Sequence, residues 1–359
     1  MDRSKYIPVL VLTAVVISVQ AITAAMGKGF YLTQLTMSAY YSLLIVGLCL
    51  LMGYAGQISL GHAGFFAIGG YISAFLTTFD LTPYQTGRLV SFRADTGLLQ
   101  ARQDLYGGHL LTLHPWSACL LAVLVAVTIA SVIGGPVLKL KGHYLAMAPL
   151  GFGIIVYAIV LATPLFGEAD GLSDVPPFEL LPGLSISGKL SLRVQNYYIA
   201  WVLVIATIIL LQNLVHSRVG RALRSIHGAE DAANAMGVDT AQYKLKTFVL
   251  SAAFAAIAGV CLTHYNGGIG PSEASIMKSV RYVAIVAIGG MANLWGALVM
   301  GSLLNFFSLR GYFGSFDDAV FGTILIVIML FSPEGLLRME IVRALSGLFR
   351  RGSAEEEAS

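Results

Sequence analysis

Glycines and neutral hydrogen-bonding side chains alternate in the stretch 53–64. Its glycines allow the backbone to leave the helical conformation, and its Gln, Ser and His can donate and accept hydrogen bonds without a formal charge. Inside a membrane, exposed backbone and helix ends can hold a polar solute, including a carboxylate, without any Lys or Arg. The candidates for such contacts are Gly56, Gln57, Ser59, Gly61 and His62. Packing between helices explains the same residues equally well, and for His62 alone packing is the better interpretation.

A second distinctive pattern lies in the segment 216–246, which is basic and rich in alanine. Apolar or small residues recur at three- and four-residue spacing from Leu223 to Met236, whereas Arg221 and Asp231 fall on another side. This spacing predicts one helix lying flat at a membrane surface. Helices that bind lipid usually present Trp, Phe or Leu, whereas the alanines here and Gly237 form a low surface that suits a groove in another protein.

Neither stretch is accompanied by residues typical of catalysis or metal binding. Cys49, Cys119 and Cys261 lie in separate apolar runs without a CxxC pair, so we expect structural thiols. Paired carboxylates and His clusters do not converge in the apolar segments, and a phosphate loop of the form GxxxxGK[ST] is absent from the sequence. The sequence therefore predicts no enzyme, no catalytic residue, no metal and no cofactor.

The composition places these candidates in a lipid bilayer. Of 359 residues, 57% are apolar and 11% are charged, with a net charge of +3, and the mean hydropathy is +0.78. Soluble domains carry about 25% charged residues, and disordered chains combine low hydrophobicity with high net charge. A soluble enzyme, a disordered chain and a nucleic-acid-binding protein are all excluded on this basis.

Helices that cross the membrane must position both stretches, and each needs about 20 apolar residues. Uncharged apolar segments run 7–26, 33–52, 60–79, 116–135, 143–166, 197–215, 247–265, 282–309 and 319–332. The first could instead be a signal peptide, although its apolar core exceeds the usual length of about 7 to 15 residues. The segment 282–309 is too long for one upright helix and is interrupted at Gly289 and Gly290, so it predicts two short helices that meet at a turn.

The predicted fold is therefore an all-α polytopic membrane protein with about ten transmembrane or part-spanning helices. No formal charge lies within any predicted span, so an intramembrane carboxylate for proton coupling is not expected. The energy source could be a gradient of the solute itself, sodium coupling through backbone carbonyls, or a separate ATPase.

The distribution of Lys and Arg predicts the orientation. With the N-terminus inside, the inner loops hold 13 of the 22 basic residues, although they are shorter in total than the outer loops. This bias follows the positive-inside rule and places both termini and the segment 216–246 in the cytoplasm.

Several motifs resemble a known family. Asp231-Ala232-Ala233, followed by Gly237, is similar to the EAA loop by which permease subunits of ABC importers dock onto their ATPases. The flanks 217–224 and 243–248, the early stretch 53–66, the stretch 138–146, Gly289-Gly290 and the late stretch 332–337 resemble the LivM-type permease of branched-chain amino acid importers.

The resemblance implies a single transmembrane permease domain over 1–352, with a cytoplasmic coupling loop at 216–246 and a disordered acidic tail at 353–359. It also implies a bacterial inner-membrane location and four kinds of partner: the lipid bilayer, a second LivH-like permease subunit, two ATP-binding subunits and a periplasmic substrate-binding protein. The residues implied in coupling to the ATPase are Arg221, Glu230, Asp231, Ala232, Ala233 and Gly237. Gly289 and Gly290 would form a hinge or turn.

Two regions depart from the family pattern, namely the outer loop 80–115, which is long, and the stretch 167–177 of the outer loop 167–196, which keeps only part of a Gly-rich segment. Both face the side from which a binding protein would deliver substrate. A urea or amide importer permease of the same superfamily, and a stand-alone secondary carrier or channel, therefore remain alternatives to an amino acid importer.

Overall fold

Helices dominate the computed structural model, which describes residues 7–82, 99–103, 109–138, 143–312 and 314–331. Its twelve α-helices in these ranges are α1 (Ile7–Ala25), α2 (Tyr31–Cys49), α3 (His62–Thr78), α5 (Pro115–Val137), α6 (His143–Ala162), α7 (Arg193–His216), α8 (Arg218–Gly228), α9 (Glu230–Ala235), α10 (Thr240–Asn266), α11 (Ile276–Gly289), α12 (Leu294–Leu309) and α13 (Asp317–Phe331). The predicted stretch 332–337, the tail 353–359 and much of the loop 80–115 lie outside the described residues.

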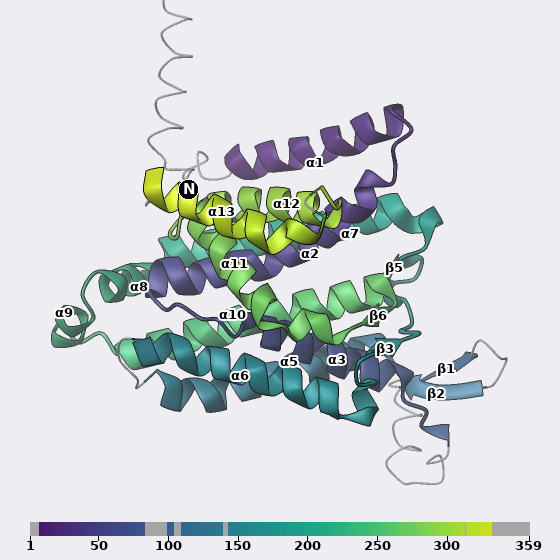
Figure 1. Cartoon of the computed structure of the whole chain (residues 1–359), viewed down its shortest axis with the longest axis horizontal. Helices are drawn as coiled ribbons and strands as arrows, with labels where there is room; N and C mark the ends of the chain where they lie inside the picture. The colour runs from purple at the N-terminus through teal and green to yellow at the C-terminus, as the bar shows by residue number, and fades with distance from the viewer. Residues whose placement is uncertain (1–6, 83–98, 104–108, 139–142, 313, 332–359) are drawn as a thin grey trace, which may run out of the picture.

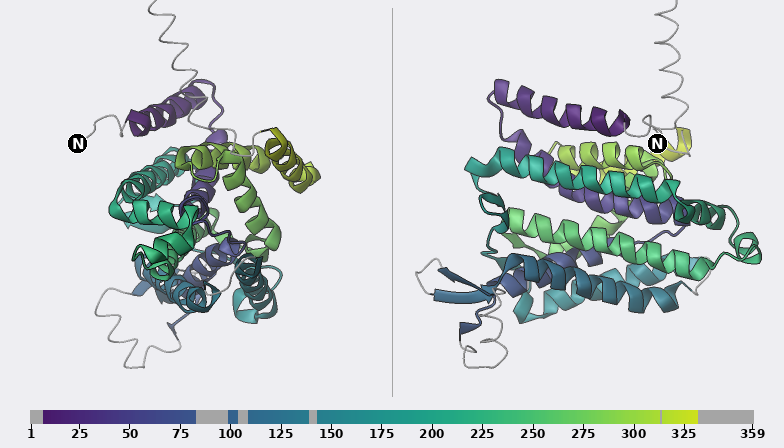
Figure 2. Two further views of the ribbon diagram at one scale, coloured as in Figure 1. Left: turned by 90° about the vertical axis from the view of Figure 1, so that its left-hand side faces the viewer. Right: turned by 180° about the vertical axis from the view of Figure 1, so that it is seen from behind.

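The longer helices run side by side along one direction, so the bundle has two distinct ends (Figures 1 and 2). Helices α8 and α9 form one end, which we call the α9 end. Short strands gather at the other, which we call the hairpin end. The first residues of α1 and the last of α13 both lie toward the α9 end, as expected for a chain with an even number of crossings (Figure 1).

Each apolar segment predicted to cross the membrane contains a helix in the structure. Five described helical stretches are long and apolar enough to span a bilayer alone: Ile7–Ala25, Tyr31–Tyr54, Pro115–Val137, Leu190–His216 and Thr240–Asn266. The segment 282–309 is broken as predicted, because α11 ends at Gly289 and α12 starts at Leu294. The predicted polytopic helical fold is confirmed.

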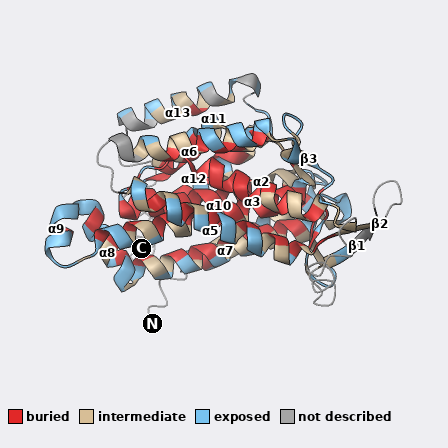
Figure 3. Ribbon diagram, turned by 90° about the horizontal axis from the view of Figure 1, so that it is seen from below, coloured by how far each residue is buried: buried red, intermediate tan, exposed pale blue. Residues whose placement is uncertain are grey.

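The core lies between α2, α3 and α10, which are the most buried helices, with α11 and α12 packed against α2 (Figure 3). Glycines bring α3 and α10 into backbone contact. A Cβ atom at Gly69 would lie 2.3 Å from the carbonyl oxygen of Ala256, and one at Gly259 would lie 2.0 Å from that of Phe66. Such close approach through small residues is the usual way in which membrane helices associate.

The outer helices present apolar side chains to their surroundings. Large hydrophobic residues are exposed on α1, α5, α6 and α7, for example Leu10, Leu120, Met147 and Val202. Apolar side chains cover these outer faces, as a helix surrounded by hydrocarbon requires.

The hairpin end contains short strands that the sequence patterns do not predict. Strands β1 (Leu99–Gln103) and β2 (His109–Leu113) pair antiparallel within the loop 80–115, and β4 (Phe178–Leu181) pairs with β5 (Leu184–Ile186) within 167–196. Strand β3 (Leu172–Ser173) pairs with β6 (Gly268–Ile269), which joins this loop to the end of α10. The two unusual loops are thus ordered in part by backbone pairing.

Candidate functional site

The segment 216–246 contains two helices rather than the single amphipathic helix that its spacing predicts. Helix α8 ends at Gly228, Ala229 adopts an extended conformation with φ −159° and ψ 98°, and α9 then begins at Glu230. The prediction of one continuous helix is therefore wrong. On the apolar side of this spacing, Leu223, Ile226 and Ala233 are buried within the chain, whereas Met236 is 84% exposed.

A sharp corner places α8 across the end of α7. The Ser217 hydroxyl accepts a hydrogen bond from the Val219 N–H at 3.1 Å and caps the start of α8. Gly220 fits against α7 because a Cβ atom there would lie 2.0 Å from the Val215 carbonyl oxygen. Arg224 Nη2 donates to that same carbonyl at 3.0 Å, so the corner is closed by backbone contact and a charged donor.

An ion pair holds α9 against the start of α10. Glu230 pairs with Lys244, whose side chain is only 9% exposed. Thr240 Oγ1 donates to Glu230 Oε1 at 3.3 Å and to Asn234 Oδ1 at 3.0 Å. Glu230 therefore bonds within the chain and orients α9, in addition to being partly exposed.

The remaining predicted coupling residues form an exposed tip. Arg221, Asp231, Ala232 and Gly237 are exposed, whereas Ala233 is buried and packs the helix onto the bundle. Gly237 ends α9 in the left-handed conformation at φ +85°, with no atom within 4 Å of the position its Cβ would occupy. The tip is small, exposed and open around Gly237.

The second predicted stretch leaves the helical conformation where its glycines occur. A π-helical turn at Leu50–Tyr54 ends α2, residues 56–61 are non-helical, and α3 begins at His62. Gly56 has φ +67°, and Gly61 packs against α6, where a Cβ atom would lie 2.4 Å from the Pro149 carbonyl oxygen. The interruption is thus a conformation that side chains at these two positions would oppose.

His62 is fully buried and braces the start of α3. Its Nδ1 and Ser59 Oγ share a hydrogen bond of 3.0 Å, and its Nε2 and Ser251 Oγ share one of 2.8 Å. Ser251 lies near the middle of α10, so α3 starts deep in the bundle. Both ring nitrogens are occupied within the chain, which favours the packing interpretation for His62.

Gln57 differs from its neighbours in having buried polar atoms without partners. The residue is 2% exposed, and neither its Oε1 nor its Nε2 has a hydrogen-bond partner in the described part of the chain. A buried amide that makes no hydrogen bond costs free energy. Of the predicted pathway residues, Gln57 is the one whose side chain retains its full hydrogen-bonding capacity.

The turn between α11 and α12 touches this stretch. Gly289 and Gly296 lie in contact, and Gly290 has φ +97°. The Asn293 side chain accepts hydrogen bonds from the N–H groups of Trp295 and Gly296, both at 3.1 Å, and thereby caps α12. Gly53 packs against the turn, because a Cβ atom there would be 1.5 Å from the Met291 carbonyl oxygen.

Helix α8 also contacts the interrupted segment. A Cβ atom at Gly56 would lie 2.9 Å from His227 Nδ1, and Tyr54 lies in the electrostatic field of Arg224. The Tyr54 hydroxyl donates to the Ala292 carbonyl oxygen at 2.8 Å. The α8–α9 unit, the interrupted segment and the α11–α12 turn therefore meet at the α9 end.

Charged residues lie deeper in the bundle than the sequence predicts. Lys278 Nζ lies 2.7 Å from Glu273 Oε1, which also accepts a hydrogen bond of 2.9 Å from the Tyr41 hydroxyl. Tyr41 is the eleventh residue of the helical stretch Tyr31–Tyr54, which places it about 15 Å along a stretch of 24 residues. The predicted span 282–309 is free of charge, but helix α11 begins before it and carries Lys278 and Arg281.

The reason is the position at which α11 begins. The Ser275 side chain accepts a hydrogen bond from the Lys278 N–H at 3.4 Å and caps the helix, so α11 starts six residues before the uncharged segment 282–309. Ser275 as a capping residue was the available signal. A segment defined by the absence of charge begins only after Arg281, so it does not include the first residues of α11.

Comparison with known proteins identifies relatives over most of the chain. The family described as "Branched-chain amino acid transport system / permease component" matches residues 30–331. The high-affinity branched-chain amino acid transport system permease protein LivM of Salmonella typhimurium is 29% identical over 326 residues, which cover 85% of this chain and 69% of that protein. LivH of Escherichia coli is 25% identical over 84% of this chain and 92% of its own length, and BraD of Pseudomonas aeruginosa is 26% identical over 86% and 95%. No solved structure matches the chain significantly.

Proposed function

Because the chain belongs to the permease family of branched-chain amino acid ABC transport systems, we propose that it moves an amino acid across the membrane with energy from separate ATP-binding subunits. A second permease subunit would complete the channel, and a periplasmic binding protein would deliver the substrate at the hairpin end. The chain itself would bind no nucleotide and carry out no bond chemistry. Its work is to open and close a path.

The observation that carries this proposal is the exposed tip formed by α9 and Gly237. The tip has short or absent side chains at Asp231, Ala232 and Gly237. Met236 projects from the same tip as a large exposed apolar residue. A flat helix with one apolar anchor is suited to a groove on a partner protein. Because the Glu230–Lys244 pair joins α9 to α10, a displacement of the tip would also displace α10.

A series of contacts connects α8 to the proposed substrate path. Helix α8 abuts Gly56 through His227, and Gly56 opens the segment 56–61 that ends at His62. His62 is bonded to Ser251 in α10, while Gly53 supports the α11–α12 turn. A displacement of α8 would therefore move the interrupted segment and the turn together.

A bulky side chain at the tip tests the docking role. Gly237→Leu would place the new side chain in open space on the tip, at the cost of a strained left-handed residue of about 1 to 2 kcal/mol. We expect normal insertion into the membrane, weaker binding of the purified ATP-binding subunits, and ATP-dependent uptake reduced by about tenfold or more if about 1.4 kcal/mol of docking energy is lost.

Gly183→Leu provides a matched control at the opposite end. Gly183 also has φ +85° and also has no atom within 4 Å of its Cβ position, but it lies between β4 and β5. The two variants carry the same backbone strain on opposite sides of the membrane. Equal affinities of both variants for the ATP-binding subunits would overturn the docking role of α9.

A further inference from the structure

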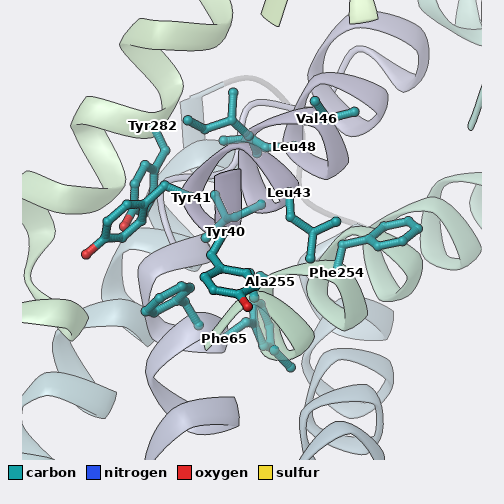
Figure 4. Packing of buried hydrophobic residues seen from close by; sticks show 14 of the residues in the cluster. Tyr40, Tyr41, Leu43, Val46, Leu48, Phe65, Phe254, Ala255 and Tyr282 are labelled. Carbon is teal, nitrogen blue, oxygen red and sulfur yellow. The ribbon is translucent and has the colours of Figure 1, made fainter. Parts of the chain in front are cut away.

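A hydroxyl group beside the Glu273–Lys278 pair has no acceptor in the described residues. Tyr282 is 1% exposed, its hydroxyl has no hydrogen-bond partner there, and it lines a small cavity together with Lys278 and Tyr41. The Tyr41 and Tyr282 rings lie beside each other, 6.2 Å between centroids, with their hydroxyls on the same side (Figure 4).

Only one oxygen of the Glu273 carboxylate has hydrogen-bond partners in the described residues. Glu273 Oε1 bonds to Tyr41 and Lys278, whereas the buried Oε2 has no partner in the described part of the chain. The unfilled hydrogen-bonding capacity therefore comprises one anionic acceptor, Glu273 Oε2, and one neutral donor, the Tyr282 hydroxyl. Because isolated buried polar groups are costly, this combination points to a ligand that supplies both a cationic donor and an anionic acceptor.

Two small cavities adjoin the pair. One, of about 50 Å³, is lined by Glu273, Thr263 and Asn266 together with the apolar Phe66, Leu262 and Ile269. The other, of about 30 Å³, is lined by Lys278, Tyr282 and Tyr41 among others. Glu273 therefore faces a partly apolar space and Lys278 faces a separate polar one.

We infer that the Glu273–Lys278 pair binds the two charged ends of an amino acid zwitterion and closes the path when the amino acid is absent. The ammonium group of the ligand would bond to Glu273, and its carboxylate to Lys278 and the Tyr282 hydroxyl. An aliphatic side chain would lie toward Phe66, Leu262 and Ile269. This inference rests on the proposed function and names the part of the chain that recognises the substrate.

The energetics of exchange favour such a role. An ion pair inside a membrane is expensive to break, because each separated charge loses its partner in a low-dielectric medium. A zwitterion gives each charge a new partner at the same time, so the path can open without leaving either charge alone. The cavities are smaller than an amino acid, so the structure corresponds to the closed arrangement and the helices must separate to admit the ligand.

The site also connects to the interrupted segment. Ser279, the next residue after Lys278, accepts a hydrogen bond of 3.2 Å from the Ala63 N–H at the start of α3. Movement of the segment 56–61 would thus act on α11 beside the ion pair. This contact explains how closure at the α9 end could change access at mid-membrane.

The test uses the complete importer, with both permeases and the ATP-binding subunits, in proteoliposomes supplied with ATP and the loaded binding protein. Glu273→Gln and Lys278→Met should each lower kcat/KM for L-leucine uptake by about 10- to 100-fold, as expected for one hydrogen bond to a charged group. The matched control is Asp317→Asn. The Asp317 carboxylate lies 3.7 Å from Arg281, which follows Lys278 by about one turn of α11, and the Asp317 side chain is buried to a similar extent as that of Glu273. This control should retain uptake.

The charge-swapped variant E273K/K278E separates recognition from structure. It keeps an ion pair and should insert normally, but it reverses the polarity that the ligand meets, so uptake should remain lost. Full uptake by the swapped variant, or a Glu273→Gln variant as active as Asp317→Asn, would overturn the inference. If the wild-type importer transports no amino acid at all, the proposed function fails instead, so the two failures are distinguishable.

Discussion

At the residue scale, Gln57 combines a stability cost with the role in the substrate path that we propose for it. Its side chain is buried without a hydrogen-bond partner in the described residues, whereas the neighbouring His62 bonds through both ring nitrogens. The sequence could identify both as candidate pathway residues, but only the packing around them separates a satisfied group from an unsatisfied one. Side-chain type alone carries no such information.

Replacing Gln57 with an apolar residue of similar size should separate the stability cost of its side chain from its proposed role in uptake. In Gln57→Leu we expect an unfolding temperature equal to or above that of the wild type, because an unsatisfied buried amide costs about 1 to 3 kcal/mol. Uptake by the reconstituted importer should nevertheless fall, since the amide would no longer be available to the substrate. Thermal unfolding and uptake are measured on the same preparation.

Gln34→Leu is the matched control for this prediction. Gln34 also has a buried side-chain oxygen without a partner in the described residues, but it lies near the start of α2, away from the interrupted segment. It should retain uptake. If Gln57→Leu loses stability and keeps full uptake, Gln57 is a structural residue and does not belong to the path.

At the scale of elements, the two helix breaks show what a sequence can predict. The break between α11 and α12 is predicted by Gly289 and Gly290, which supply the backbone freedom that the turn uses. The break between α8 and α9 occurs at Ala229, where a good helix former adopts an extended conformation. Its cause is tertiary, because the Glu230–Lys244 pair and the Thr240 hydrogen bonds draw α9 onto α10.

The same limit applies to the charges on α11. A window of uncharged residues predicts where a span lies, but it ends at the first charged residue and so begins α11 after Arg281. The helix in fact starts at Ile276 and carries Lys278 to Glu273 and Tyr41. Long-range pairing, which a local window does not detect, makes these charges tolerable in the bundle.

The orientation of α9 provides a prediction at this scale. Lys244→Met should loosen α9 from α10 and weaken binding of the ATP-binding subunits by about fivefold, because a partly buried ion pair of this kind contributes about 1 kcal/mol. Glu230→Gln should act in the same direction. Affinity is measured with the purified chain in detergent, while the circular dichroism spectrum checks that the helices remain folded.

The reversed pair E230K/K244E provides the control for this effect. If the pair acts by orienting α9, the reversal should recover much of the affinity that the single variants lose. If Glu230 instead contacts the ATPase directly, the reversal should bind as weakly as the single variants. That result would contradict the positioning role.

For the whole molecule, the two ends of the bundle differ in structure. The α9 end combines the exposed tip, the α11–α12 turn and the interrupted segment, whereas the hairpin end contains the three small strand pairs of the described residues. The sequence predicted about ten transmembrane or part-spanning helices, and each predicted segment contains a helix. The described residues hold twelve α-helices because the segment 216–246 adds α8 and α9. It did not predict the strands. Among the described strands, only β3 and β6 join residues distant in the chain, such as Leu172 and Ile269, whereas β1–β2 and β4–β5 are hairpins within the loops 80–115 and 167–196.

The deep ion pair bears on the source of energy. The absence of a carboxylate from the predicted spans argues against a proton-coupled carrier, but Glu273 bonds to Tyr41 inside the bundle and weakens that argument. Membership of the ABC transport family favours a separate ATPase instead, which is the basis of our proposal that ATP-binding partner subunits supply the energy. The choice between the two mechanisms therefore depends on transport by the isolated chain.

The most direct measurement is uptake of radiolabelled L-leucine into proteoliposomes against a concentration gradient. One set contains this chain alone with an imposed proton or sodium gradient, and the other contains the full complex with ATP and the loaded binding protein. The account predicts accumulation only in the second set, and its loss when ATP is replaced by a non-hydrolysable analogue. Accumulation by the chain alone would contradict it.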